Sequence, residues 1–162
     1  MFDSIKRVLS GDVSSFSDKG AHGGAHLDAL QIAVCVVLLE VAHADDTFSS
    51  EGRDQIMRFF EEGARLSPEA TEELLQLAEQ ARKQAVELWQ FTHLIAVNFS
   101  VEQKLKLVEA MWTLIYIDGK LDMREDYLIH KLSTLLGLRH SELIETKLRV
   151  LRQRGSNEPD LL

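Results

Sequence analysis

Apolar residues recur along most of this chain at the three- and four-residue spacing of an α-helix, and the alternation typical of β-strands is scarce. The strongest stretch runs from residue 26 to about residue 44, where Leu30, Val34 and Val41 share one side of the predicted helix. It predicts a central, mostly buried helix. A shorter stripe, made of Phe2, Ile5, Val8 and Leu9, predicts a first helix ahead of a Ser- and Gly-rich connection. The pattern therefore predicts an all-α protein.

Capping signals divide the rest of the chain into further helices, expected at about 50–63, 68 into the eighties, 91–99, 101–115, 123–136 and 141–152. Ser67-Pro68-Glu69 is a start signal, because Ser caps a helix and Pro suits its first position. Ser100 with Gln103 and Asp122 with Glu125 are capping boxes, and Gly137 suits a helix end. We expect one compact domain of seven or eight helices at 26–153, between an N-terminal helix and connection at 1–25 and a frayed tail at 154–162.

A short acidic motif occurs twice, about seventy residues apart. The copies are residues 42–51 (AHADDTFSSE) and residues 115–125 (IYIDGKLDMRE), and each lies between two apolar segments of helical period. The chain is therefore predicted to use one helix–acidic turn–helix unit twice, and such internal repetition is informative about architecture.

Composition limits the possible classes of function. The 162 residues carry a net charge of −8, which argues against a protein that tracks nucleic-acid phosphates. The single cysteine, Cys35, excludes an intrachain disulfide and fits a reducing compartment. No apolar run approaches the roughly 20 residues of a membrane-spanning helix, and residues 1–9 do not form a signal peptide. A cytoplasmic location is the expectation.

The second motif resembles part of an EF-hand calcium loop, but two ligand positions of such a loop fall on Leu114 and Tyr116. Leucine cannot ligate a hard cation, and in the first copy the closing glutamate position holds Gly52. An EF-hand is therefore not predicted. Glycine-rich phosphate loops, nucleophile elbows and HExxH motifs are also missing, so we do not expect an enzyme.

The two helix–acidic turn–helix units, with Phe91 and Trp112 in the helices between the turns, resemble the TerB-like family, which includes tellurite-resistance proteins and the N-terminal region of DjlA-type co-chaperones. The resemblance covers roughly residues 26–151 and implies an all-helical domain. It also implies a divalent cation held by acidic residues. The matching acids are Asp45, Asp118 and Glu125, and Glu51 lies one residue before the usual family position.

A purely structural interpretation of these acids stays open. Asp122 and Glu125 can cap a helix, Ser49 or Ser50 can cap another, and Glu51 is favoured by the helix dipole. His43 is either a further ligand or a residue beside the turn that pairs with an acid.

Cys35, among valines, is expected to be a small buried hydrophobe. The aromatic residues recur at helical spacing and predict core, with an exposed groove as the alternative for Trp89.

Two hypotheses about function follow. In the first, the protein is a cytoplasmic TerB-like accessory protein in metal (tellurite) or stress response, with a weak divalent-cation site at Asp45, Asp118, Glu125 and Glu51. In the second, it is a metal-free interaction module that docks a protein partner, and the acids serve as helix caps. Its basic C-terminal helix or its N-terminal turn could dock an acidic partner or touch a membrane surface, although a short amphipathic helix commonly folds onto its own core. The basic residues concerned are Lys6, Arg7, Lys147, Arg149, Arg152 and Arg154.

Overall fold

Local capping sets where most of the helices begin. The structure, a computed structural model, describes residues 28–44, 48–85, 87–118 and 121–155, except the side chain of residue 118. The helices are α2 (Ala29–Ala42), α3 (Ser50–Gly63), α4 (Pro68–Gln84), α5 (Trp89–Asn98), α6 (Val101–Ile115), α7 (Met123–Leu135) and α8 (His140–Gly155), with a 3-10 turn η2 (Tyr116–Asp118). The described residues contain no strand, which confirms the all-α prediction.

Each predicted cap that lies in the described residues is formed. Ser67 caps α4 with Pro68 at the first helical position, and both capping boxes predicted from the sequence form at the N-termini of α6 and α7. Of the two candidates for the cap of α3, Ser49 takes the role. Gly137 has φ +83°, the left-handed conformation that ends a helix and that L side chains rarely adopt.

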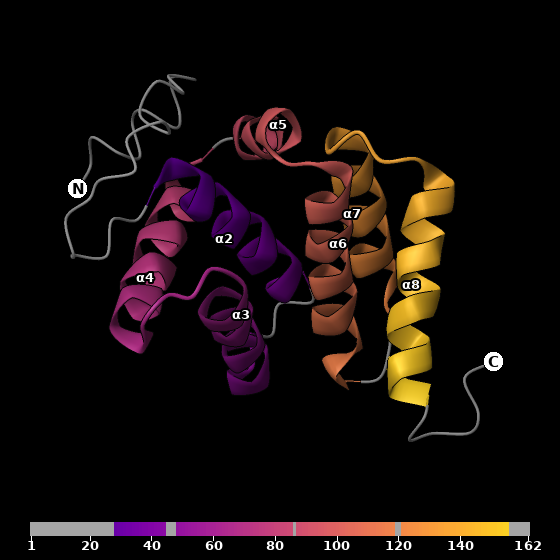
Figure 1. Cartoon of the computed structure of the whole chain (residues 1–162), viewed down its shortest axis with the longest axis horizontal. Helices are drawn as coiled ribbons and strands as arrows, with labels where there is room; N and C mark the ends of the chain where they lie inside the picture. The colour runs from indigo at the N-terminus through magenta and orange to yellow at the C-terminus, as the bar shows by residue number, and fades with distance from the viewer. Residues whose placement is uncertain (1–27, 45–47, 86, 119–120, 156–162) are drawn as a thin grey trace.

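Helix α2 lies at the centre of the fold and contacts α3, α4, α5, α6 and α7. Every residue from Ile32 to Leu39 is buried, which explains why this helix is apolar all round. In Figure 1, α2, α3 and α4 form one side of the molecule, α6, α7 and α8 form the other, and α5 crosses the top. The two predicted helix–turn–helix units are α2–α3 and α6–η2–α7, so they lie on opposite sides and meet through α2 and α6.

The aromatic residues divide between core and surface. Trp112 and Phe91 are fully buried, and the Trp112 indole N–H donates a 3.2 Å hydrogen bond to Thr146 Oγ1. Trp89 is 52% exposed and stacks on His93, with ring centroids 4.7 Å apart. The core prediction is therefore wrong for Trp89, because α5 turns this side toward solvent while Phe91 faces the core.

The basic C-terminal helix makes contacts within its own chain. Arg149 pairs with Glu109 of α6 and Glu145 of α8, and the Lys147 ammonium lies 5.4 Å from the centre of the Trp112 ring. Two of the four basic residues therefore hold α8 onto α6.

Some predictions fall on other parts of the chain. The N-terminal helix and connection at 1–25 and most of the tail at 154–162 lie outside the described residues. Among the residues that the structure describes, no helix is both long and apolar enough to cross a bilayer.

Candidate functional site

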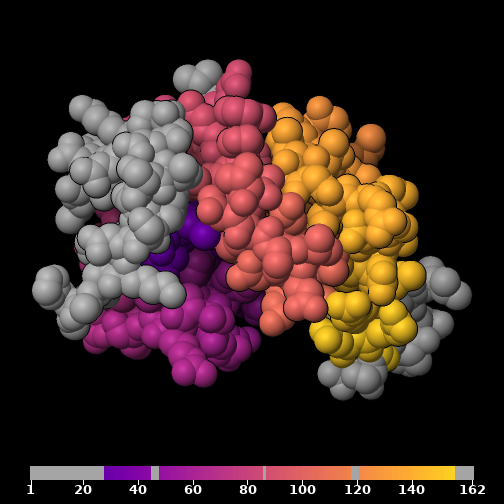
Figure 2. Space-filling model, turned by 45° about the horizontal axis from the view of Figure 1, so that its top comes forward, coloured from indigo at the N-terminus to yellow at the C-terminus, as the bar shows by residue number. Residues whose placement is uncertain are grey.

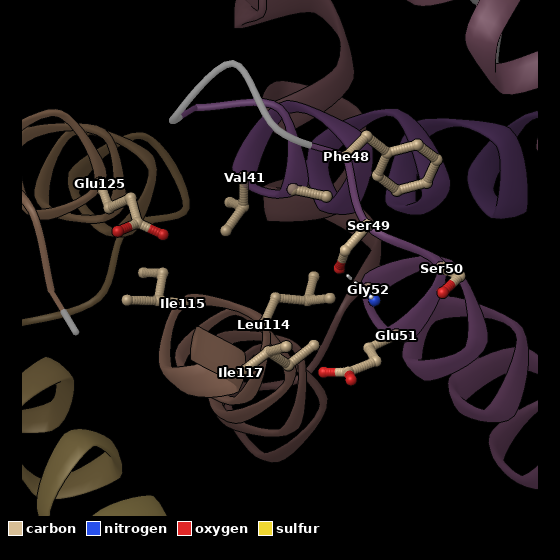
Figure 3. Close-up of a pocket in the computed structure, with 11 residues that line it drawn as sticks. Val41, Phe48, Ser49, Ser50, Glu51, Gly52, Leu114, Ile115, Ile117 and Glu125 are labelled. Carbon is tan, nitrogen blue, oxygen red and sulfur yellow. Dashed lines mark hydrogen bonds between the residues drawn. The ribbon is translucent and has the colours of Figure 1, made fainter. Parts of the chain in front are cut away.

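The two acidic turns border one pocket of about 230 Å³. Its first side comes from the end of α2 and the start of α3, and its second side from the end of α6, η2 and the start of α7 (Figure 3). We call it the inter-turn pocket. Its apolar lining is Val41, Ala42, Phe48, Leu114, Ile115 and Ile117, and its polar lining is Ser49, Ser50, Glu51, Gly52 and Glu125. Segments about seventy residues apart in sequence therefore converge in space.

Glu125 supplies a buried carboxylate to this pocket. It is the third residue of α7 and only 5% exposed. Its Oε1 accepts a 3.1 Å hydrogen bond from the Asp122 backbone N–H, and its own N–H donates to Asp122 Oδ1 at 2.8 Å. Figure 3 shows the carboxylate turned toward Ile115 and the pocket interior. The capping box therefore fixes the direction of a charged group that burial would otherwise disfavour.

Negative charge at this end of the molecule also acts on Tyr116, which follows α6 and is 8% exposed. Burial raises the pKa of the Tyr116 hydroxyl, and the charges of Asp126 and Glu125 raise that pKa further against the opposing effect of Arg154. The surroundings of the second turn therefore disfavour the ionised form of Tyr116, as expected for a hydroxyl that is buried beside carboxylates.

The first turn contributes differently. Ser49 Oγ accepts a 3.0 Å hydrogen bond from the Gly52 N–H and caps α3. Glu51, in the first turn of α3, is exposed, and its carboxylate points toward the pocket edge near Ile117 (Figure 3). Counting from each cap, Gly52 is the counterpart of Glu125, since both occupy the third helical position. The two halves of the pocket are therefore not equivalent: one has a buried carboxylate where the other has a glycine.

Two of the four predicted metal ligands cannot be placed at the pocket. Asp45 lies outside the described residues, and of Asp118 only the backbone is described, as the last residue of η2. Ala42 and Phe48, on either side of residues 45–47, both line the pocket. Among the described side chains, no group of three or more His, Cys, Asp or Glu residues has an arrangement that could hold a metal ion.

His43 belongs to a separate polar cluster on the other side of the first turn. Its Nε2 lies 3.4 Å from Glu79 Oε2 of α4, outside hydrogen-bonding geometry, and its ring packs 4.6 Å from that of Phe48. Glu79 also accepts a 2.7 Å hydrogen bond from Arg82. Burial would raise the pKa of Glu79, but the hydrogen bond and charge of Arg82, together with the charge of His43, lower it overall. The interpretation of His43 as a residue paired with an acid therefore agrees with its surroundings.

The apolar walls of the pocket were not predicted as part of a site. Leu114, Ile115 and Val41 follow the helical apolar pattern, which indicates burial and does not distinguish a pocket wall from core. The useful signal in the sequence was the comparison of the two motif copies, in which the closing glutamate position of the first copy falls on Gly52 and not on Glu51.

Comparison with known proteins agrees with this architecture. A family model described as "Tellurite resistance protein TerB" matches residues 31–148. No curated protein and no solved structure matches the chain. Since the matched region takes in most of the chain and both helix–turn–helix units, the chain belongs to the TerB family.

Proposed function

We propose that this TerB-family chain is an accessory protein that binds a divalent cation at the inter-turn pocket, and that it acts by binding and not by turnover. The observation that carries the proposal is the buried carboxylate of Glu125, aimed into a pocket that both acidic turns border. A helix cap alone does not require the turns to converge. The family description, a tellurite-resistance protein, supports a role in the response to metal or stress.

The donor chemistry favours hard cations. Carboxylate oxygens of Glu125 and Glu51 and hydroxyl oxygens of Ser49 and Ser50 line the pocket. Oxygen donors suit Mg²⁺, Ca²⁺ and Mn²⁺, whereas Zn²⁺ favours histidine and cysteine. Two carboxylates do not complete a shell of six or more oxygens, so Asp45, Asp118 and water are the expected remaining ligands.

The second hypothesis, a metal-free interaction module, has its own support. The Asp122–Glu125 capping box is complete, so these acids already have a structural task. The apolar part of the pocket lining could receive a side chain of a protein partner. Under this hypothesis, cations leave the stability of the protein unchanged.

Thermal unfolding of chelator-treated protein, with and without each cation, separates the two hypotheses. We expect Mg²⁺, Ca²⁺ or Mn²⁺ to raise Tm more than Zn²⁺, and a cation at 100 times its Kd adds about 2.7 kcal/mol to the free energy of unfolding. Asp118→Asn should lose this increase. Glu145→Gln, an exposed position on α8, serves as the matched control and should keep it. Isothermal titration with the effective cation gives the stoichiometry, expected to be one.

An equal or absent response to every cation in the wild-type protein would contradict the proposal. A response that survives in Asp118→Asn would move the cation away from the second acidic turn.

A further inference from the structure

A second recess, distinct from the inter-turn pocket, lies at the opposite end of α2. It has a volume of about 350 Å³ and is mainly apolar. Val34 and Phe60 form its floor, and the half-buried side chains of Leu30, Phe59 and Phe99 form its walls. In Figure 2, the indigo residues of α2 lie recessed between magenta residues and the salmon residues of α6. We call this recess the α2 groove.

The first residue that the structure describes lies at this groove. Asp28, the first described residue and the N-cap of α2, lines the groove. Whatever precedes Asp28 therefore starts at the groove rim, and the eighteen residues 10–27 separate it from the apolar stripe of residues 2–9. A Gly- and Ser-rich chain of that length spans roughly 25 Å between its ends. The stripe can therefore reach every part of the groove.

The stripe needs a surface on which to bury itself. Phe2, Ile5 and Leu9 follow the i, i+3, i+7 spacing of one helix face, with Val8 beside them. Isolated helices shorter than about 12 residues are marginal in water, so such a segment becomes stably helical mainly by packing its apolar face. The segment carries Lys6, Arg7 and Asp3, a net positive charge, while the rest of this acidic chain is negative. An amphipathic helix in an apolar groove is a recurring mode of recognition.

We propose that residues 2–9 of the same chain dock as an amphipathic helix in the α2 groove. Attachment to the groove rim gives the segment an effective concentration in the millimolar range, which favours it over a free peptide of the same sequence. The docked segment would shield Leu30, Phe59 and Phe99 from solvent. This inference is independent of the cation proposal, because the inter-turn pocket is at the other end of α2.

Paramagnetic NMR on the full chain tests the docking. A nitroxide is attached at Ser4→Cys, and the single native cysteine does not compete because Cys35 is fully buried and burial raises the pKa of its thiol. We expect amide signals at the start of α2, the end of α3 and the start of α6 to broaden. Signals of α8 should stay sharp.

Variants assign the contact to the stripe and the groove. Phe2→Asp with Ile5→Asp should abolish the broadening, whereas Ser14→Asp with Ser15→Asp adds the same charge to the connection and should preserve it. Ala64→Arg changes an exposed residue that lines the groove and should weaken the contact. Its matched control is the exposed Gln76→Arg on α4, which should leave the contact unchanged.

Three results would overturn the proposal. Broadening centred on the exposed Trp89 of α5, with the start of α2 and the end of α3 left sharp, would identify another docking surface. In a second sample, ¹⁵N-labelled protein without a nitroxide is mixed with nitroxide-labelled protein without ¹⁵N. Broadening of the groove signals in this mixture would identify a second copy of the chain as the occupant. Uniform broadening without a focus would mean that the stripe does not dock.

Discussion

Replacing Glu125 with glutamine removes the buried charge of the inter-turn pocket while leaving the exposed carboxylate of Glu51 and the cap of α7 in place. Glutamine also serves at this capping-box position, and in this protein Gln31 and Gln103 do so in α2 and α6. The 3.1 Å hydrogen bond from the Asp122 N–H can therefore persist. The variant loses a favourable interaction with the helix dipole of about 0.3–1 kcal/mol but also loses the cost of a buried charge. We expect its stability in chelator to change by less than about 1 kcal/mol.

The response to the cation should change far more. If Glu125→Gln weakens affinity a hundredfold, a cation concentration that stabilises the wild type by about 2.7 kcal/mol stabilises the variant by only about 0.4 kcal/mol. For a domain of this size, 1 kcal/mol corresponds to a Tm change of about 4 °C. The cation-induced rise in Tm should therefore fall from about 10 °C to about 2 °C, a difference that scanning calorimetry or fluorimetry resolves easily.

Two results would refute this reasoning in different ways. If Glu125→Gln keeps the full cation-induced rise in Tm, Glu125 is not a ligand and the burial of its carboxylate serves the cap alone. If the variant loses more than about 2 kcal/mol in chelator, the fold itself requires the charge. Glu125→Ala removes the charge and the side-chain acceptor of the Asp122 N–H, while Asp122 still caps α7; this companion variant should cost about 0.5–1.5 kcal/mol without any cation.

Three further predictions concern other positions. Gly52→Glu would create a capping box with Ser49 and add a third carboxylate to the pocket; its Cβ would meet Ser49 Oγ at 3.4 Å, an ordinary contact. It should stabilise α3 by about 0.5–1 kcal/mol and tighten cation binding in titration calorimetry, and a clear loss of stability would show that the site lacks room. Thr146→Val leaves the buried Trp112 N–H without its partner and should cost about 1–3 kcal/mol in urea unfolding, so an unchanged midpoint would contradict this role. Because the folded-state pKa of Glu79 is lowered, its contribution to stability is present above its unfolded pKa and is lost as pH falls through the folded pKa. Glu79→Gln should therefore flatten the stability profile below about pH 4.5, and an identical acid limb in both proteins would count against it.

Helix limits were predictable because their causes are local. The caps Ser67, Ser100 and Asp122 bind backbone N–H groups three residues further along the chain. Both partners of each cap are therefore neighbours in the amino-acid sequence. The dense apolar pattern of residues 26–44 likewise predicted a central, mostly buried helix, and the contacts of α2 with five other helices confirm it. The fold class and the two helix–turn–helix units follow from such short-range patterns.

The choice between Trp89 and Phe91 was not local. Both lie on α5 and both are aromatic, yet Phe91 is buried and Trp89 is half-exposed. The helical period places the side chains of Trp89 and Phe91 on different sides of α5. Which of these sides faces the core depends on how α5 packs against α2 and α7. The partner of His43 was hidden for the same reason, because Glu79 lies on α4 and no pattern near residue 43 indicates it.

The sequence by itself determined the helices, their caps, the duplicated turn and a list of acidic candidates, because each depends on residues a few positions apart. Only the tertiary structure decided that the ends of α2 and α6 pack together so that Glu51 and Glu125 border one pocket. It also decided that Glu125 is buried and Glu51 exposed, since burial depends on what the neighbouring helices cover. Long-range packing turned a repeated local motif into one asymmetric pocket.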